Sequence, residues 1–172
     1  MKKIAVFLFV AMVALSAKAQ VYVGGSLGFW HNDDGKGKTT SIIAPEIGYN
    51  INPKWSIGGT VILSHTKLDK YNTNGFGIAP YARYSYYENE RVRLFVDGGF
   101  GLSSKKEFNS DEREGGFEIG LKPGFSLKLN DKFSVLAKCG FLGYRDDYLM
   151  GEDGTGLSLS GENLSFGLYY QF

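Results

Sequence analysis

The sequence predicts an all-β protein, an eight-stranded antiparallel transmembrane β-barrel with an up-and-down meander, preceded by a signal peptide. Three observations support this fold class: an export segment at the N-terminus, eight long runs that alternate between apolar and small or polar residues, and connections that are alternately short and long. In the last run, Leu164, Phe166, Leu168, Tyr170 and Phe172 share one side of a strand, because strand side chains repeat every two residues.

The first 19 residues have the features of a secretory signal peptide. Lys2 and Lys3 form a basic start, Ile4–Leu15 is almost entirely apolar, and Ala17-Lys18-Ala19 is a small-x-small cleavage site. The apolar run is shorter than the ~20 residues that a membrane-spanning helix needs. We therefore expect residues 1–19 to be removed and residues 20–172 to form a single β-barrel domain.

Composition excludes other classes of protein. Of 19 basic residues, three lie in the signal peptide, which leaves 16 against 18 acidic residues in the mature chain. A nucleic-acid-binding protein needs a clustered basic surface, so we expect no nucleic-acid partner. Cys139 is the single cysteine, so no internal disulfide can support the fold.

The eight expected strands are long enough to cross a bilayer at a tilt, for which ~9 to 11 residues are needed, whereas soluble strands average about five or six. Their bounds are Val21–His31, Thr39–Asn50, Lys54–Thr66, Gly75–Tyr87, Arg91–Ser103, Gly116–Leu129, Lys132–Arg145 and Glu162–Phe172.

The connections alternate in length. Residues 51–53, 88–90 and 130–131 form short turns, and the long polar connections are 32–38, 67–74, 104–115 and 146–161. Short periplasmic turns and longer external loops are typical of barrels in the bacterial outer membrane. The pattern predicts this location, with both termini in the periplasm and any external ligand at the four long loops.

One side of the strands carries small residues and a few charges of both signs, which predicts the crowded lumen of an eight-stranded barrel. Buried charges need partners, and counting through the turn places Asp97 opposite Lys122. An ion path is an alternative, but the narrow lumen favours a structural network that plugs the barrel. The expected members of this lumen network are Glu46, Arg83, Arg93, Asp97, Glu118, Lys122 and Lys138.

The other side is almost free of charge and is expected to face lipid; it includes Val135, Phe141, Phe166 and Leu168. Aromatic residues gather on it near the short turns, which predicts a belt at the inner membrane interface. The belt residues are Tyr49, Trp55, Tyr84, Tyr86, Phe133, Tyr170 and Phe172.

Three prolines lie midway along strands, at Pro45, Pro80 and Pro123, each after a Ile-Ala or Leu-Lys pair. Proline has no N–H to donate to a strand ladder. We expect each proline to occupy a locally unpaired position on the outer face.

Motifs for catalysis, metals and cofactors are weak. Residues 35–39 are similar to the end of a P-loop but lack its first glycine and lead into a strand. His31 and His65 have no metal-ligand spacing to another His or Cys. The acidic loop 146–161 could bind a cation but matches no calcium-loop pattern. We expect no catalytic residue, no metal and no cofactor.

The signal peptide, the amphipathic strands, the connection pattern and the C-terminal Leu168-Tyr169-Tyr170-Gln171-Phe172 resemble the small outer-membrane β-barrel proteins of the OmpX and OmpA-transmembrane-domain type. The Ile-Ala-Pro repeats and Tyr-rich strands resemble the outer membrane β-barrel domain proteins of Bacteroidota. The resemblance covers essentially residues 20–172 and rests on pattern rather than on a catalytic motif.

This resemblance implies a monomer that contacts outer-membrane lipids and lipopolysaccharide and is inserted by the barrel-assembly machinery. It also implies a non-enzymatic role in surface interaction, adhesion or envelope integrity. Three alternatives stay open: a narrow porin-like channel, a lipid A-modifying outer-membrane enzyme, and a soluble lipocalin-like binder.

The export segment gives the first testable prediction. The mature protein purified from membranes should begin at Gln20, because signal peptidase cleaves after the small residue of a small-x-small site. Intact-mass measurement checks this, and a mass that still includes Met1–Ala19 would contradict it.

Overall fold

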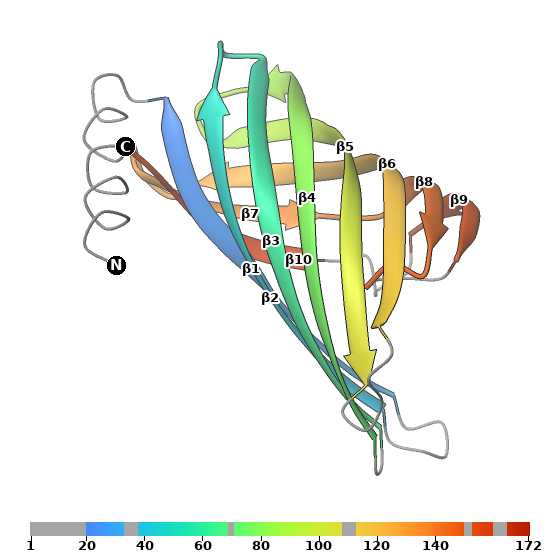
Figure 1. Ribbon diagram of the computed structural model, residues 1–172. Coiled ribbons are helices and arrows are strands. Elements are labelled where there is room, and N and C mark those ends of the chain that lie inside the picture. The colour runs from blue at the N-terminus through green and yellow to red at the C-terminus, as the bar shows by residue number, and fades with distance from the viewer. Residues whose placement is uncertain (1–19, 33–37, 69–70, 108–112, 150–152, 160–164) are drawn as a thin grey trace, which may run out of the picture.

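The computed structural model describes residues 20–32, 38–68, 71–107, 113–149, 153–159 and 165–172. The predicted signal peptide lies outside these residues, so its cleavage stays a prediction. Ten strands make up the described fold (Figure 1). They are β1 (Val21–Asn32), β2 (Lys38–Asn50), β3 (Trp55–Leu68), β4 (Tyr71–Glu88), β5 (Val92–Glu107), β6 (Arg113–Lys128), β7 (Phe133–Lys138), β8 (Phe141–Asp146), β9 (Gly154–Ser158) and β10 (Ser165–Gln171).

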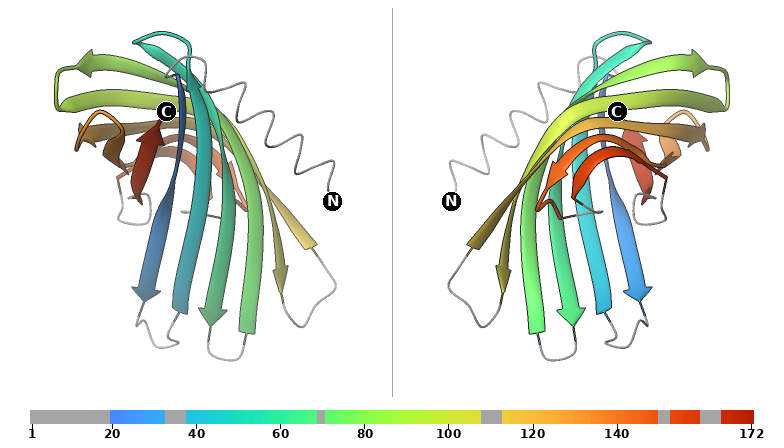
Figure 2. Two further views of the ribbon diagram at one scale, coloured as in Figure 1. Left: turned by 90° about the vertical axis from the view of Figure 1, so that its left-hand side faces the viewer. Right: turned by 90° about the vertical axis from the view of Figure 1, so that its right-hand side faces the viewer.

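The strands close into an antiparallel barrel with eight walls. Each of β1 to β6 pairs with the next strand in the chain, β6 pairs with both β7 and β8, and β10 pairs with β7 and with β1. The start of β1 and the end of β10 therefore lie side by side, with Tyr22 opposite Gln171 (Figure 2). This arrangement confirms the predicted eight-stranded meander.

The three short turns share one construction, which the length of the connections alone does not predict. In each turn an asparagine carboxamide oxygen accepts the backbone N–H groups two and three residues later: Asn52 from Lys54 and Trp55 (2.9 Å each). Asn89 and Asn130 do the same, at 2.6 to 2.9 Å. Such Asx turns satisfy N–H groups locally and reverse the chain in few residues.

The seventh wall is interrupted where a single strand was expected. Cys139 and Gly140 separate β7 from β8, and the pairing with β6 shifts by one residue, from Gly124 opposite Lys138 to Leu121 opposite Leu142. Gly140 has φ +84°, a conformation that side chains disfavour, so glycine permits this bulge. Because one extra residue exchanges the two faces of a strand, Phe141 is buried in the lumen rather than facing lipid as expected.

Each mid-strand proline pairs on one side only. Pro45 is opposite Gly25 of β1, Pro80 opposite Gly59 of β3, and Pro123 opposite Val96 of β5. On its other side, each proline lies at a gap in the pairing with the next strand in the chain. The register is the same before and after the gap at Pro45 and Pro80. Pro45 and Pro80 are exposed, so the expected unpaired positions on the outer face are confirmed there, while Pro123 is half-buried.

The two faces of the barrel differ as predicted. Apolar side chains on the outward face are exposed, with Phe166 at 57% and Leu168 at 52%. Among the residues of the expected aromatic belt, the ring centres of Trp55 and Tyr84 are 4.9 Å apart and those of Phe133 and Tyr170 are 5.1 Å apart. Inside, a Cβ at Gly24 would collide with the Tyr169 ring, so small residues make room for large lumen side chains.

Leu168→Lys should destabilise the barrel. Leu168 points outward and lies four residues from the belt residue Phe172, which places it ~10 Å into the apolar band at the usual rise and tilt. We expect the free energy of unfolding in lipid vesicles, measured with urea, to fall by ~2 to 4 kcal/mol.

The matched control is Leu129→Lys, because Leu129 is exposed in the turn between β6 and β7, outside the apolar band. It should leave the unfolding free energy nearly unchanged. Equal stability of the Leu168→Lys variant and the wild type would contradict the orientation of β10.

Candidate functional site

An ion-pair network fills the middle of the lumen. Arg83 on β4 donates from Nε and Nη2 to both carboxylate oxygens of Asp97 on β5, at 2.6 and 2.9 Å. Lys138 on β7 lies 3.0 Å from Asp97 and 3.0 Å from Glu46 on β2. Arg83 also reaches Glu46 at 3.2 Å. Two acids and two bases from four walls thus neutralise each other in the interior of the barrel.

Aromatic side chains enclose this inner network. The hydroxyl groups of Tyr169 and Tyr81 both donate to Glu46, the first at 2.5 Å. The Arg83 guanidinium lies 4.1 Å from the centre of the Phe95 ring, and Tyr22 stacks on Tyr169 with 5.5 Å between ring centres. Every oxygen of Glu46 therefore has several donors, as a buried carboxylate requires.

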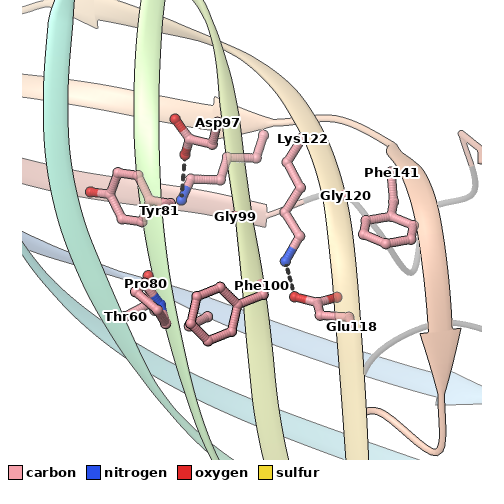
Figure 3. Close-up of a pocket in the computed structure, with 12 residues that line it drawn as sticks. Thr60, Pro80, Tyr81, Asp97, Gly99, Phe100, Glu118, Gly120, Lys122 and Phe141 are labelled. Carbon is pink, nitrogen blue, oxygen red and sulfur yellow. Dashed lines mark hydrogen bonds and ion pairs between the residues drawn. The ribbon is translucent and has the colours of Figure 1, made fainter.

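A second network lies nearer the external end. Glu118 on β6 accepts the Lys122 ammonium (Figure 3). It also accepts Arg145 Nε at 3.0 Å. The Arg145 guanidinium lies 3.7 Å from the centre of the Phe141 ring. Between the two networks is a cavity of about 40 Å³, with room for a few water molecules. Its lining includes Thr60, Tyr81, Asp97, Glu118, Lys122 and Lys138.

The connection after β8 turns into the barrel. Tyr148 is buried and packs with Ala44 and Ile62, and Leu149 packs against the same cluster. Asp147, with φ 49°, begins the turn, and its N–H donates to Asp153 at 2.8 Å. The expectation that residues 146–161 form an external loop is therefore wrong for the described part of this segment. Tyr148 and Leu149 pack inside the barrel, where we call them the plug, and Gly154–Ser158 form the strand β9.

The opposite end opens into a vestibule of about 820 Å³ beside the short turns. Arg93 and Lys128 both bind one oxygen of Glu88 there, at 2.9 and 2.7 Å. The vestibule narrows towards Arg83 and Tyr169, which line the next cavity inward. Arg93 thus lies at this mouth, whereas the other six expected lumen residues lie in the two inner networks.

The expected pairing of Asp97 with Lys122 is only partly reproduced. The two residues are opposite each other in the β5–β6 register. However, among the contacts of the described residues, Asp97 binds Arg83 and Lys138, and Lys122 binds Glu118.

Sequence reasoning missed Arg145 and the lumen tyrosines. Simple alternation from Lys138 places Arg145 on the outer face, and only the extra residue at Cys139 and Gly140 turns it inward. Gly140 was the available signal, because an isolated glycine inside a strand pattern marks a bulge. Tyr148 had no comparable signal, since its position depends on the packing of one connection.

Comparison with known proteins identifies the class of protein to which this barrel belongs. The family model described as "Outer membrane protein beta-barrel domain" matches residues 4–172. The chain belongs to this family, and its location is the bacterial outer membrane. A search of curated protein sequences gave no match.

Solved structures share the fold at 16% sequence identity. Ail of Yersinia pestis in a phospholipid bilayer nanodisc has a TM-score of 0.55 over 90% of this chain and 100% of its own. The N-terminal barrel of Pseudomonas aeruginosa OprF gives 0.54 (90% and 98%), and Neisserial surface protein A gives 0.51 (89% and 95%). Ail in complex with the heparin analogue sucrose octasulfate gives 0.53 (89% and 97%).

In the described part of the chain, no helix long and apolar enough to cross a membrane is found. The described residues also contain no group of three or more His, Cys, Asp or Glu residues arranged to hold a metal ion.

Glu46→Gln should strongly destabilise the protein. The variant keeps the shape but leaves Arg83 and Lys138 with Asp97 as their shared carboxylate, and an uncompensated buried charge is costly. We expect the free energy of unfolding to fall by about 3 kcal/mol, measured with urea in vesicles.

Glu88→Gln is the matched control, because Glu88 makes its ion pairs at the hydrated mouth. Exposed pairs are worth ~0 to 1 kcal/mol, so this variant should change little. An equal loss in both variants would contradict a special role for the inner network.

Proposed function

We propose that this protein is a non-enzymatic outer-membrane barrel that acts through its external surface, in adhesion to a partner or in keeping the envelope intact. The observation that carries the proposal is the filled lumen. Two ion-pair networks, the rings around them and the plug Tyr148–Leu149 occupy it from the middle to the external end. The membrane-spanning part is then a rigid support for whatever is presented outside.

The strands themselves extend the external surface. β3 and β4 stay paired with each other as far as Leu68 opposite Tyr71. β5 and β6 stay paired with each other as far as Lys106 opposite Arg113. Strands of 14 to 18 residues exceed the ~9 to 11 needed to cross a bilayer. Ail, which shares this fold, has been crystallised with a sulfated sugar, which supports a ligand-binding surface on a barrel of this size.

A lipid A-modifying activity is not favoured by the described residues. A nucleophile and its base must lie within hydrogen-bond reach of each other. Ser64 and His65 are adjacent on β3 and point to opposite faces, and His65 Nδ1 lies 2.7 Å from Asn74 Oδ1. Mass spectrometry of lipid A from a deletion strain tests this alternative directly, and a lost lipid A species would support an enzyme.

The proposed role is tested by shortening the external surface. Replacing residues 67–72 by Asn-Gly removes the end of the β3–β4 hairpin and keeps its register, because Lys67 pairs with Asn72. We expect a folded barrel, shown by heat-dependent gel mobility, with weaker surface binding or greater detergent sensitivity of the cells. A folded variant with wild-type behaviour in both assays would count against the role of this hairpin.

A narrow channel is the second candidate, favoured by the 820 Å³ vestibule at one mouth. We expect no discrete conductance steps for the wild type in planar bilayers. The same result is expected for Tyr148→Ala with Leu149→Ala, because the Arg83–Asp97 pair still blocks the lumen after the plug is removed. Reproducible steps in the wild type would establish a channel instead.

A further inference from the structure

The mouth beside the short turns gathers cations on the inward face of three neighbouring walls. Arg93 on β5 is opposite Ser126 on β6, and Lys128 on β6 is opposite Ser134 on β7. Residues opposite each other in an antiparallel sheet point to the same face. Lys132 lies two residues before Ser134 and shares that face. We call Arg93, Lys128 and Lys132 the mouth cations; all three line both the vestibule and the narrower cavity inward of it, which we call the recess.

Positive charge increases from the vestibule into the recess. The vestibule has four basic and three acidic residues in its lining: the mouth cations and Arg91, with Glu88, Glu90 and Asp131. The lining of the recess, which belongs entirely to the described residues, includes the mouth cations and Arg83 but no carboxylate. Asp97 and Glu46 already neutralise Arg83, so the mouth cations carry the surplus. A cleft that carries one sign of charge between low-dielectric walls concentrates ions of the opposite sign.

Glu88 is shared between two of the mouth cations. Its Oε1 accepts Arg93 Nη2 at 2.9 Å and Lys128 Nζ at 2.7 Å. Arg93 Nε is buried and has no hydrogen-bond partner among the described residues. In the inner network, by contrast, Arg83 donates from both Nε and Nη2 to two carboxylate oxygens. The protein therefore supplies fewer acceptors than donors at this mouth, whereas it matches the arginine of the inner network.

We propose that the mouth cations bind a soluble oxyanion with two or more negative charges, a phosphate or a polycarboxylate, that enters from the side of the short turns. Arginine binds such groups through parallel N–H donors, and lysine binds them as a point charge. The vestibule of about 820 Å³ is as large as a typical small-molecule site, while the recess of about 40 Å³ admits only a few atoms. The charged end of the ligand therefore lies at the recess, and the remainder stays in the vestibule.

The closed wall around this mouth favours a soluble anion over a lipid. β10 pairs with β1 on one side and with β7 on the other, down to Tyr22 opposite Gln171 and Phe133 opposite Tyr170. A soluble anion reaches the mouth cations through the open end, whereas a lipid head group would have to leave the bilayer. The site lies at the opposite end from the surface invoked in the proposed function, so either can fail without the other.

The test uses the full mature chain folded in phosphatidylcholine nanodiscs, which leave both mouths open to solution. Isothermal titration calorimetry measures the binding of inorganic pyrophosphate, citrate and acetate. We expect pyrophosphate and citrate to bind more tightly than acetate, because three mouth cations against Glu88 leave two positive charges, and we expect added salt to weaken binding. Arg93→Gln with Lys128→Gln should weaken pyrophosphate binding by about fivefold for each cation removed. Absence of pyrophosphate and citrate binding to the folded wild type overturns the proposal.

Glu88→Gln gives the opposite expectation. Glu88 competes with the ligand for two mouth cations, so its neutralisation should tighten pyrophosphate binding by about fivefold. Removal of a carboxylate would have no such effect if the mouth were only a solvated ring of ion pairs. Unchanged or weaker binding in the folded Glu88→Gln variant therefore overturns the proposal.

The charge-matched control is Lys54→Gln with Arg113→Gln. Lys54 lies in another short turn and does not line the vestibule, and Arg113 lies at the external end of β6. This control should bind pyrophosphate as the wild type does, and an equal loss in the control and in the mouth variant overturns the proposal. Heat-dependent gel mobility confirms that each variant is folded. If the double mouth variant does not fold, the single variant Lys132→Gln, at an exposed position, replaces it with an expected loss of about fivefold.

A lipid arm identifies the source of the anion. The wild type and the double mouth variant are released from nanodiscs of phosphatidylcholine and phosphatidylglycerol, and native mass spectrometry measures the retained phosphatidylglycerol. Equal retention by both proteins supports a soluble ligand. Retention by the wild type that is lost in the variant means that a lipid head group occupies the mouth, and the assignment of a soluble anion is overturned.

Discussion

Backbone hydrogen bonding in a layer without water is the constraint on which this structure depends. Each unpaired N–H or C=O group in hydrocarbon costs several kcal/mol, so a spanning sheet must close on itself. The pairing of β1 with β10 provides this closure, and the start of β1 and the end of β10 lie on the side of the short turns. The prolines respect the same constraint. Proline has no N–H to leave unpaired, so the interruption at Pro45 or Pro80 exposes at most an acceptor, which is more easily tolerated than an orphaned donor.

Closure with eight walls leaves little room inside. The lumen is filled by side chains of complementary size and by ion pairs between walls. Glycines such as Gly24 and Gly48 give space to the rings of Tyr169 and Tyr22. The charged residues then connect walls that are not hydrogen-bonded to each other: Glu46 on β2 meets Lys138 on β7 and Arg83 on β4. A buried network of this kind is weak evidence for stability, because desolvation offsets most of the attraction. The network instead fills the lumen with side chains that hold one another in one arrangement. A filled lumen fits a structural support better than a pore.

Much of this fold was accessible from sequence because a two-residue period separates lipid from lumen. The alternation placed Leu168 outside and Glu46, Asp97 and Lys138 inside, and the short turns set the order of the walls. Counting by twos fails wherever one residue is inserted. The bulge at Gly140 exchanges the faces of β8, so the expectation that Phe141 faces lipid is wrong, and Arg145 points into the lumen. The position of Tyr148 depends on packing against Ala44 and Ile62, which lie on strands far away in the sequence. No local sequence pattern encodes such a contact.

The two long sides of the barrel differ in a way that bears on how it meets its surroundings. β3 to β6 continue as regular paired strands past the apolar layer, and their outward row ends in Lys106 and Arg113. β8 and β9 are short, and the connection between them turns inward through Tyr148 instead of extending the wall. One part of the barrel therefore extends the wall as a regular sheet, and the next part turns inward and closes the lumen. Because extended strands lose little entropy on binding, compared with loops that must first be ordered, the tall side is the better platform for an external contact.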